Sequence, residues 1–190
     1  MLGETSSTEL VWSGIEYDSI EHCQVSYDHE GIDINSTILG YYQGNIYFVQ
    51  YMIRTDKTWT TRKVQVNSKI NGVEQSTRLE TEGNGTWIIN GKEDATFQDC
   101  FDVDLPLSPF TNTLPINRLR MQEHDMRQIK VIYIDLLKQM ITPVFQKYIR
   151  LTDAEYRYEN VPNDFEAVIR VDANGFVINY PTLFKRVTSK

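Results

Sequence analysis

Turn-forming residues recur along this chain at short intervals and constrain it to a succession of hairpins. Asn71-Gly72 and Asn90-Gly91 are the clearest of these turns, and β-branched and aromatic runs lie between them. Such pairs join neighbouring antiparallel strands directly. The pattern therefore predicts a mainly β (α+β) fold. The expected strands are 9–17, 21–28, 32–41, 45–53, 62–70, 73–81, 86–90, 129–137, 144–151, 155–160, 165–171 and 176–180, with 136–141 as an alternative helical turn.

Two of these strands indicate how the sheet lies. Between residues 62 and 70 apolar and polar side chains alternate, which is typical of a strand with one buried face. Residues 45–53 are largely apolar on both faces, so this strand is expected to be central or to lie between the core and another apolar surface. A sheet of this size must curl or split. A large curled antiparallel sheet with a short helix or loop across its mouth would enclose an apolar cavity.

Composition narrows the class of protein. The 190 residues are expected to form a single half-barrel domain, 1–190, with 1–8 and 188–190 frayed. A net charge of −7 with scattered basic residues disfavours nucleic acid as a partner. The absence of a secretory signal, and of an apolar run of about 20 residues, predicts a cytoplasmic protein without integral membrane association. The two cysteines, Cys23 and Cys100, are expected to be free and buried.

Residues 99–116 differ from the rest of the chain, because they combine three aspartates, three prolines and a Thr-Asn-Thr sequence. Each proline fixes its own φ and removes a backbone donor. The backbone is therefore expected to follow one rigid path. A short helix is predicted near 113–118, with Asn112 as its N-cap and Pro115 in its first turn. This segment either contacts a ligand or locks the helix across the sheet.

Asp102 and Asp104 are the candidates for chemistry within this segment. Spaced two residues apart on an extended backbone, they point to the same face. Such a pair can bind a divalent cation or divide acid and base roles. We favour the alternative that they pair with arginines or cap nearby backbone, because Asp-x-Asp is a common string, and the candidate arginines are Arg62, Arg118 and Arg120.

Aromatic residues suggest a binding surface. A tryptophan beside hydroxyls, as at Trp59, can stack on a sugar ring or cover a cavity mouth. Trp87 follows a glycine that lets a ligand approach, although core packing is the favoured role for both rings. Tyr51 and Tyr148 combine apolar area with a polar tip, which suits a pocket for an amphipathic molecule and also any half-exposed strand.

Motifs for catalysis are missing from the sequence. There is no nucleotide-binding, serine-hydrolase or metalloprotease motif, and no zinc-ligand spacing. We therefore expect neither a metal nor a cofactor, and we favour a binding role over an enzymatic one.

Several segments together resemble a bacterial family described as "putative glycolipid-binding". The segments are Trp12-Ser-Gly14, Asp56-Lys-Thr-Trp59 with Arg62, Gly85-Thr-Trp87, Asp99-Cys-Phe-Asp-Val-Asp-Leu105, Pro109-Phe-Thr-Asn-Thr-Leu-Pro-Ile116, Tyr148-Ile-Arg-Leu151 and Tyr180-Pro181. The resemblance spans nearly the whole chain and implies a curled sheet around a helical plug, similar to bacterial lipoprotein carriers and to an enzyme of violacein biosynthesis. It also implies a lipid or glycolipid ligand.

Three hypotheses follow. The first, which we favour, is a binding protein for an amphipathic small molecule, with ligand contacts from Tyr51, Trp59, Arg62, Trp87, Asp102, Asp104, Arg118 and Tyr148. The second is an enzyme of lipid or secondary metabolism that positions a reactive intermediate in the same cavity, with polar contacts from Asp102, Asp104, Arg62 and His22. The third is a structural or interaction protein, in which a sheet edge pairs with a second copy to form a homodimer.

Overall fold

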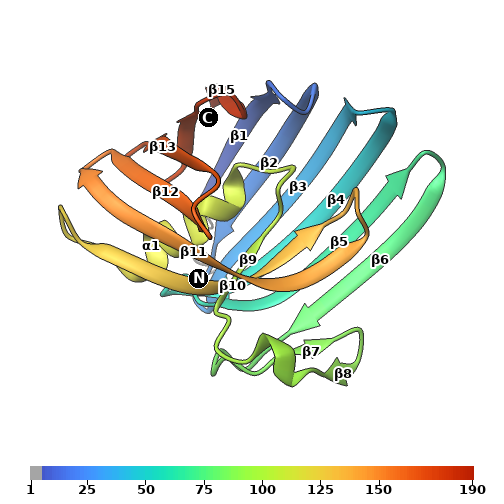
Figure 1. Cartoon of the computed structure of the whole chain (residues 1–190), viewed down its shortest axis with the longest axis horizontal. Coiled ribbons are helices and arrows are strands. Elements are labelled where there is room, and N and C mark those ends of the chain that lie inside the picture. The colour runs from blue at the N-terminus through green and yellow to red at the C-terminus, as the bar shows by residue number, and fades with distance from the viewer. Residues whose placement is uncertain (1–5) are drawn as a thin grey trace.

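The computed structural model describes residues 6–190, which form a fifteen-stranded sheet curled around a short helix (Figure 1). The strands are β1 (Ser7–Gly14), β2 (Ser19–Tyr27), β3 (Gly31–Tyr42), β4 (Asn45–Asp56), β5 (Thr61–Ile70), β6 (Val73–Glu80), β7 (Ile88–Ile89), β8 (Lys92–Glu93), β9 (Asp102–Asp104), β10 (Met126–Asp135), β11 (Met140–Thr152), β12 (Glu155–Val161), β13 (Glu166–Val171), β14 (Val177–Tyr180) and β15 (Phe184–Ser189). The helical elements are η1 (Ala95–Phe97), η2 (Phe110–Asn112) and α1 (Thr113–Leu119). The predicted mainly β half-barrel with a helical plug is confirmed.

The sheet consists of two meanders joined at one seam. Its strand order is β8-β7-β6-β5-β4-β3-β2-β1-β15-β14-β13-β12-β11-β10-β9. The seam is the antiparallel pairing of β1 with β15, in which Leu10 lies opposite Ser189. β9 pairs in parallel with β10. This direction is possible because η2 and α1 lie between the two strands in the sequence and supply the crossover that parallel strands need.

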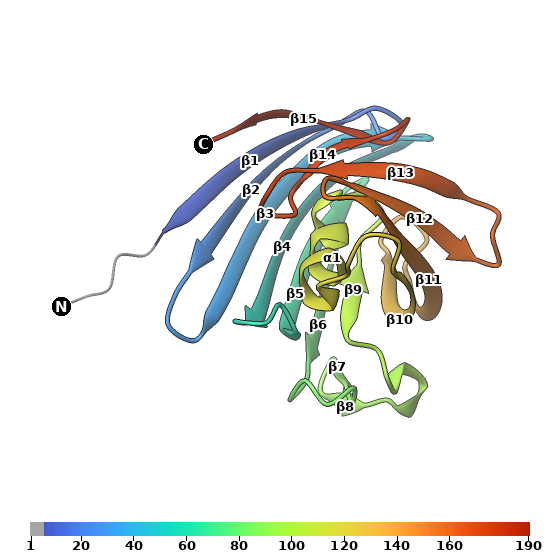
Figure 2. The same ribbon diagram turned by 90° about the vertical axis from the view of Figure 1, so that its left-hand side faces the viewer.

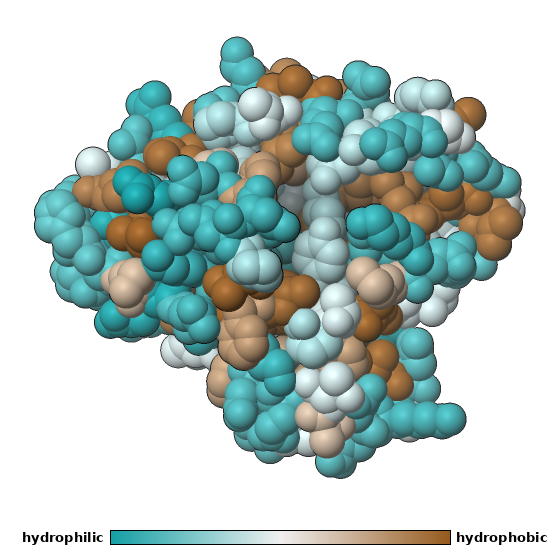
Figure 3. Space-filling model, viewed as in Figure 1, coloured by the Kyte–Doolittle hydropathy of each residue, from teal (hydrophilic) through white to brown (hydrophobic). Residues whose placement is uncertain are grey.

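The concave face of the sheet forms the main core. In β4 the side chains of Tyr47, Val49 and Ile53 are buried, whereas Ile46 and Phe48 on the opposite face are exposed. β4 pairs with β3 on one side and β5 on the other, so the expected central position is confirmed. On the face seen in Figure 3, polar residues divide the exposed apolar surface into several patches.

The helical plug lies inside the curve of the sheet (Figure 2). Phe110 and Leu114 are fully buried, and the Phe110 ring meets Trp12 edge-on at a centroid distance of 6.5 Å. Thr113 Oγ1 donates a 3.1 Å hydrogen bond to the Gly175 carbonyl and so attaches the helix to the second meander. Pro115 lies in the first turn of α1, where its missing N–H leaves no bond unmade.

The predicted N-cap at Asn112 is wrong. Its backbone already has helical angles, φ −65° and ψ −26°, because η2 runs directly into α1, and its side chain makes no capping hydrogen bond. A side-chain cap needs an extended backbone at that position. The Asn112 amide instead donates to the Pro109 carbonyl at 3.3 Å, and its oxygen accepts from Tyr148 at 3.0 Å.

The strand predictions differ from the structure mainly near the end of the chain. β15 was not predicted, because its sequence is largely polar and most of its side chains are exposed. Residues 136–139 form the turn between β10 and β11. Residues 188–190, which were expected to be frayed, pair with β1. Thr188 lies opposite Val11, and the Lys190 amide donates to the Glu9 carbonyl at 2.9 Å. β1 begins at Ser7, and the expectation for 1–5 lies outside the described residues.

Candidate functional site

The structure distributes the eight residues proposed as ligand contacts over several places. Tyr51 is buried on β4, and its hydroxyl donates a 2.6 Å hydrogen bond to Glu21 Oε1. The same carboxylate oxygen accepts from Ser36 at 2.7 Å and from Ser108 at 2.9 Å. Glu21 Oε2 is buried and, among residues 6–190, has no hydrogen-bond partner. Burial raises the pKa of Glu21 to about 7, and the three donors oppose this rise.

Asp102 and Arg118 form a buried ion pair. Arg118 Nε donates to Asp102 Oδ1 at 3.0 Å, and Nη2 donates to Oδ2 at 2.5 Å. The pair joins β9 to the last turn of α1, so it holds the plug against the sheet. Burial raises the pKa of Asp102, whereas the guanidinium lowers it. The preference for an arginine partner is therefore confirmed at Asp102, which pairs with Arg118, and is wrong at Asp104, which bonds to Thr111 and Gln146.

Trp59 lies in the connection from β4 to β5, Arg62 lies near the start of β5, and Trp87 lies between β6 and β7. Trp59 precedes β5 rather than lying within it, with a φ of 67°, and its ring packs edge-on against Tyr27 and Phe176. The Arg62 guanidinium donates to Asp56 at 2.8 Å. The indole of Trp87 is fully buried, and its N–H donates to the Cys100 carbonyl at 2.7 Å.

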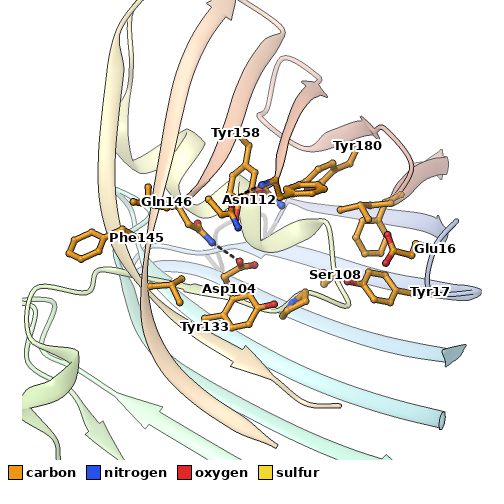
Figure 4. Close-up of a pocket in the computed structure, with 17 residues that line it drawn as sticks. Glu16, Tyr17, Asp104, Ser108, Asn112, Tyr133, Phe145, Gln146, Tyr158 and Tyr180 are labelled. Carbon is orange, nitrogen blue, oxygen red and sulfur yellow. Dashed lines mark hydrogen bonds between the residues drawn. The ribbon is translucent and has the colours of Figure 1, made fainter. Parts of the chain in front are cut away.

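Asp104 borders a cavity of about 340 Å³, which the other seven residues do not line. The cavity lies between the second meander, the segment that leads into the plug, and the β1–β2 turn (Figure 4). Its lining residues are Glu16, Tyr17, Asp104, Pro106, Ser108, Asn112, Tyr133, Val144, Phe145, Gln146, Tyr158, Asn160, Val161, Phe165, Tyr180, Leu183 and Phe184.

Two hydrogen bonds fix the Asp104 carboxylate. Thr111 Oγ1 donates to its Oδ1 at 3.0 Å, and Gln146 Nε2 donates to its Oδ2 at 2.6 Å. Burial raises the pKa of Asp104, and these two donors oppose the rise. A carboxylate has about four acceptor positions. Asp104 can therefore accept further hydrogen bonds from a molecule in the cavity.

Four tyrosines surround Asp104 in the cavity: Tyr17, Tyr133, Tyr158 and Tyr180 (Figure 4). Burial raises the pKa of the Tyr133 and Tyr158 hydroxyls, and the Asp104 carboxylate is the next contributor for both. Within the described part of the chain these four hydroxyls donate to no other side chain or carbonyl, and none is a buried unpaired atom. They are protonated donors at neutral pH and are available to a ligand.

Aromatic packing holds the wall of the cavity together. Tyr158 meets Tyr180 at a centroid distance of 6.2 Å and Phe165 at 6.1 Å, and Tyr17 stacks on Phe184 at 5.7 Å. Contacts between aromatic rings stabilise the folded state by more than the burial of their apolar surface alone. The wall therefore presents aromatic rings in fixed positions rather than as mobile side chains.

Comparison with known proteins places the chain in a family. The model of the family described as "Putative glycolipid-binding" matches residues 9–186. The chain belongs to this family. A crystal structure of a DUF1089 family protein from Pseudomonas aeruginosa is similar, with 30% sequence identity and a TM-score of 0.82 over 90% of this chain and 92% of that chain. No curated protein matches this chain.

In this member of the putative glycolipid-binding family, neither a membrane-spanning helix nor a metal-binding cluster is found between residues 6 and 190. No helix in that range has the length and apolar character needed to cross a membrane. No group of three or more His, Cys, Asp or Glu side chains is placed to hold a metal ion there.

Sequence reasoning missed the residues that make this site. Tyr180 was named only within the Tyr180-Pro181 segment, and Tyr133, Gln146 and Tyr158 were not singled out. A partial signal was present, because Tyr156 and Tyr158 share one face of a strand whose other face carries Glu155, Arg157 and Glu159. Glu21 gave no signal, since a glutamate in a strand is normally exposed.

Proposed function

We propose that this protein binds an amphipathic small molecule, a lipid or glycolipid, in the tyrosine-lined cavity. The observation that carries the proposal is the combination of fixed aromatic walls with a carboxylate that retains free acceptor positions. Of the eight residues proposed from the sequence, Asp104 is the one that we retain as a ligand contact. The family description supports this class of ligand.

The size and chemistry of the cavity fit such a ligand. Ligand pockets commonly measure about 300–1,000 Å³ and combine apolar walls with a few fixed polar groups. This cavity measures about 340 Å³. Its aromatic rings offer apolar contact area, and Asp104 and Asn112 offer orientation through hydrogen bonds. A cytoplasmic location and a homodimer remain predictions from the sequence.

Two matched variants test the proposal. Val144 lines the cavity, and Val144→Trp would fill it. Val168 lies on a strand of the same meander, is exposed and does not line the cavity, so Val168→Trp is the control. Native mass spectrometry of freshly purified protein, followed by organic extraction, measures the bound molecule. We expect the wild type and Val168→Trp to retain a lipid at a fixed stoichiometry and Val144→Trp to lack it. Equal retention by all three proteins would place the ligand elsewhere.

A further inference from the structure

We infer that the ligand enters head group first, with an uncharged, hydroxyl-rich head group against Asp104 and its hydrocarbon chain leaving past Phe145 and Val161. This inference rests on the proposed function and adds the orientation and the chemical class of the head group. Three observations carry it: the distribution of polar and apolar groups between buried and exposed lining residues, the charge of the lining, and the free hydrogen-bonding positions.

Most of the buried residues that line the cavity carry a polar group, and two of the three exposed ones are apolar. Ser108 and Gln146, which lie near Asp104, are each only 2% exposed. Phe145 and Val161, which lie opposite one another on β11 and β12, are 46% and 40% exposed, and Glu16 is the third exposed residue. A hydrocarbon chain packed against the buried polar groups would form no hydrogen bonds with them. This distribution places the polar end of the ligand at the buried polar groups and its chain at Phe145 and Val161.

The charge of the lining excludes an anionic head group. The lining residues include the carboxylates of Asp104 and Glu16 and no lysine or arginine. Two basic side chains on the elements around it are engaged in ion pairs, since Arg118 pairs with Asp102, and Lys147 pairs with Glu159 at 2.8 Å. A phosphate or carboxylate beside Asp104 would meet a like charge in a partly dehydrated site, which is strongly unfavourable. A fatty acid or phospholipid head group is therefore a poor occupant.

The free hydrogen-bonding positions match hydroxyl groups. Asp104 accepts two hydrogen bonds from the protein and has room for about two more. The hydroxyls of Tyr133, Tyr158 and Tyr180 stand near it as donors. A hydroxyl both donates and accepts, so one sugar ring can serve both sets. At about 30 Å³ per water in the liquid, the cavity of about 340 Å³ holds about eleven waters, which is room for one sugar ring and a few methylenes.

Three octyl compounds with different head groups test the inference. They are octyl glucoside, octyl phosphate and octyl tetraethylene glycol, each titrated below its micelle concentration at pH 8 and followed by calorimetry and NMR. We expect octyl glucoside to bind at least about tenfold more tightly than octyl phosphate. The uncharged glycol ether is expected to bind more weakly than the glucoside, because it has a single hydroxyl that can donate to Asp104 and its ether oxygens only accept. Sugar protons should show NOEs to the Tyr158 and Tyr180 rings, and the terminal methyl should show none to them.

Asp104→Asn removes the negative charge of this side chain and keeps the side chain's shape. We expect the ratio of the dissociation constants of octyl phosphate and octyl glucoside to fall by about fivefold or more. Asp135→Asn, at the end of the adjacent β10, is the control, because Asp135 is buried but does not line the cavity; it should leave the preference unchanged.

The outcomes separate this inference from the proposed function. Octyl phosphate binding as tightly as the glucoside, methyl protons in contact with Tyr158, or an unaltered preference in Asp104→Asn would overturn the head-group-first orientation while a binding cavity remained. No binding of any of the three compounds would remove the proposed function and the inference with it.

Discussion

The hydroxyl of Tyr51 and the carboxylate of Glu21 share a 2.6 Å hydrogen bond beneath the helical plug. Ser108, which also lines the cavity, donates to the same oxygen at 2.9 Å. A carboxylate buried in the first meander is thereby attached to the segment that leads into the plug. The protonation of Glu21 is therefore linked to how firmly the plug sits in the sheet.

Glu21 makes the stability of the protein depend on pH. Burial raises its pKa from 4.5 to about 7, so the folded protein holds a proton that the unfolded chain has released between these values. The free energy of unfolding therefore falls as pH rises from about 4.5 to about 7, by about 3 kcal/mol at about 1.4 kcal/mol per pKa unit. Glu21→Gln keeps the acceptor oxygen and removes this ionisation. Urea unfolding at pH 5 and pH 8 should show the variant gaining stability relative to the wild type by about 3 kcal/mol at the higher pH. An equal difference at both pH values would contradict it.

The ion pair between Arg118 and Asp102 is expected to be costly to break from one side. Arg118→Met leaves Asp102 buried without its partner, and the loss is typically about 3–5 kcal/mol. The double variant with Asp102→Asn should recover most of this loss, because neither charge remains. Arg78→Met, which breaks the exposed pair with Glu80, is the control and should change stability by about 1 kcal/mol or less. A double-mutant cycle by urea unfolding measures the coupling free energy between Arg118 and Asp102. Additive losses of unfolding free energy in the two single variants would contradict a strong ion pair.

Tyr148 and Tyr158 lie opposite one another on β11 and β12 and form a matched pair for mutation. The Tyr148 hydroxyl donates to Asn112 Oδ1 at 3.0 Å, so Tyr148→Phe leaves a buried amide oxygen unpaired and should cost about 1–3 kcal/mol. The Tyr158 hydroxyl faces the cavity, so Tyr158→Phe should change stability by about 0.5 kcal/mol or less and weaken the binding of octyl glucoside. Urea midpoints and calorimetry separate the two effects. Equal losses of stability would show that the cavity hydroxyl is structural.

The thiols of Cys23 and Cys100 are expected to be inert in the folded protein. Both are free and fully buried, and burial raises the pKa of Cys100 to about 11. The reactive thiolate is thus scarce at pH 8 and inaccessible to solvent. A chromogenic thiol reagent should label neither residue at a rate above that of unfolding, and both should react in urea. Rapid labelling of one thiol under native conditions would reveal local opening at that strand or loop.

Local sequence patterns were sufficient to predict most of the fold. The Asn-Gly turns and the alternation in 62–70 depend on neighbouring residues, and the strands that they predicted exist. β15 was not predicted from the sequence, because its stability comes from pairing with β1, a strand at the other end of the chain. The prediction that Asn112 caps α1 was wrong, because η2 immediately precedes α1 and gives Asn112 a helical backbone.

The site was less accessible to sequence reasoning, because it depends on contacts between distant segments. The Asp-x-Asp spacing identified Asp104, but its partners Thr111 and Gln146 are fixed by the plug and by β11. Asp102 and Asp104 are two residues apart and have different roles, an ion pair and a cavity wall. The spacing of the two aspartates predicted that their side chains point to the same face of the strand. The packing of the plug against the sheet determined which residues each carboxylate contacts.

The seam between β1 and β15 gives assembly a definite order. Ser13 and Lys185, which meet across it, lie 172 residues apart. Each meander can form from neighbouring hairpins, whereas the seam requires closure of nearly the entire chain, which slows such contacts. In a chain emerging from the ribosome, β1 therefore remains an unpaired edge on one side until β15 has been made. Joining of the two meanders is expected to be a late step in folding.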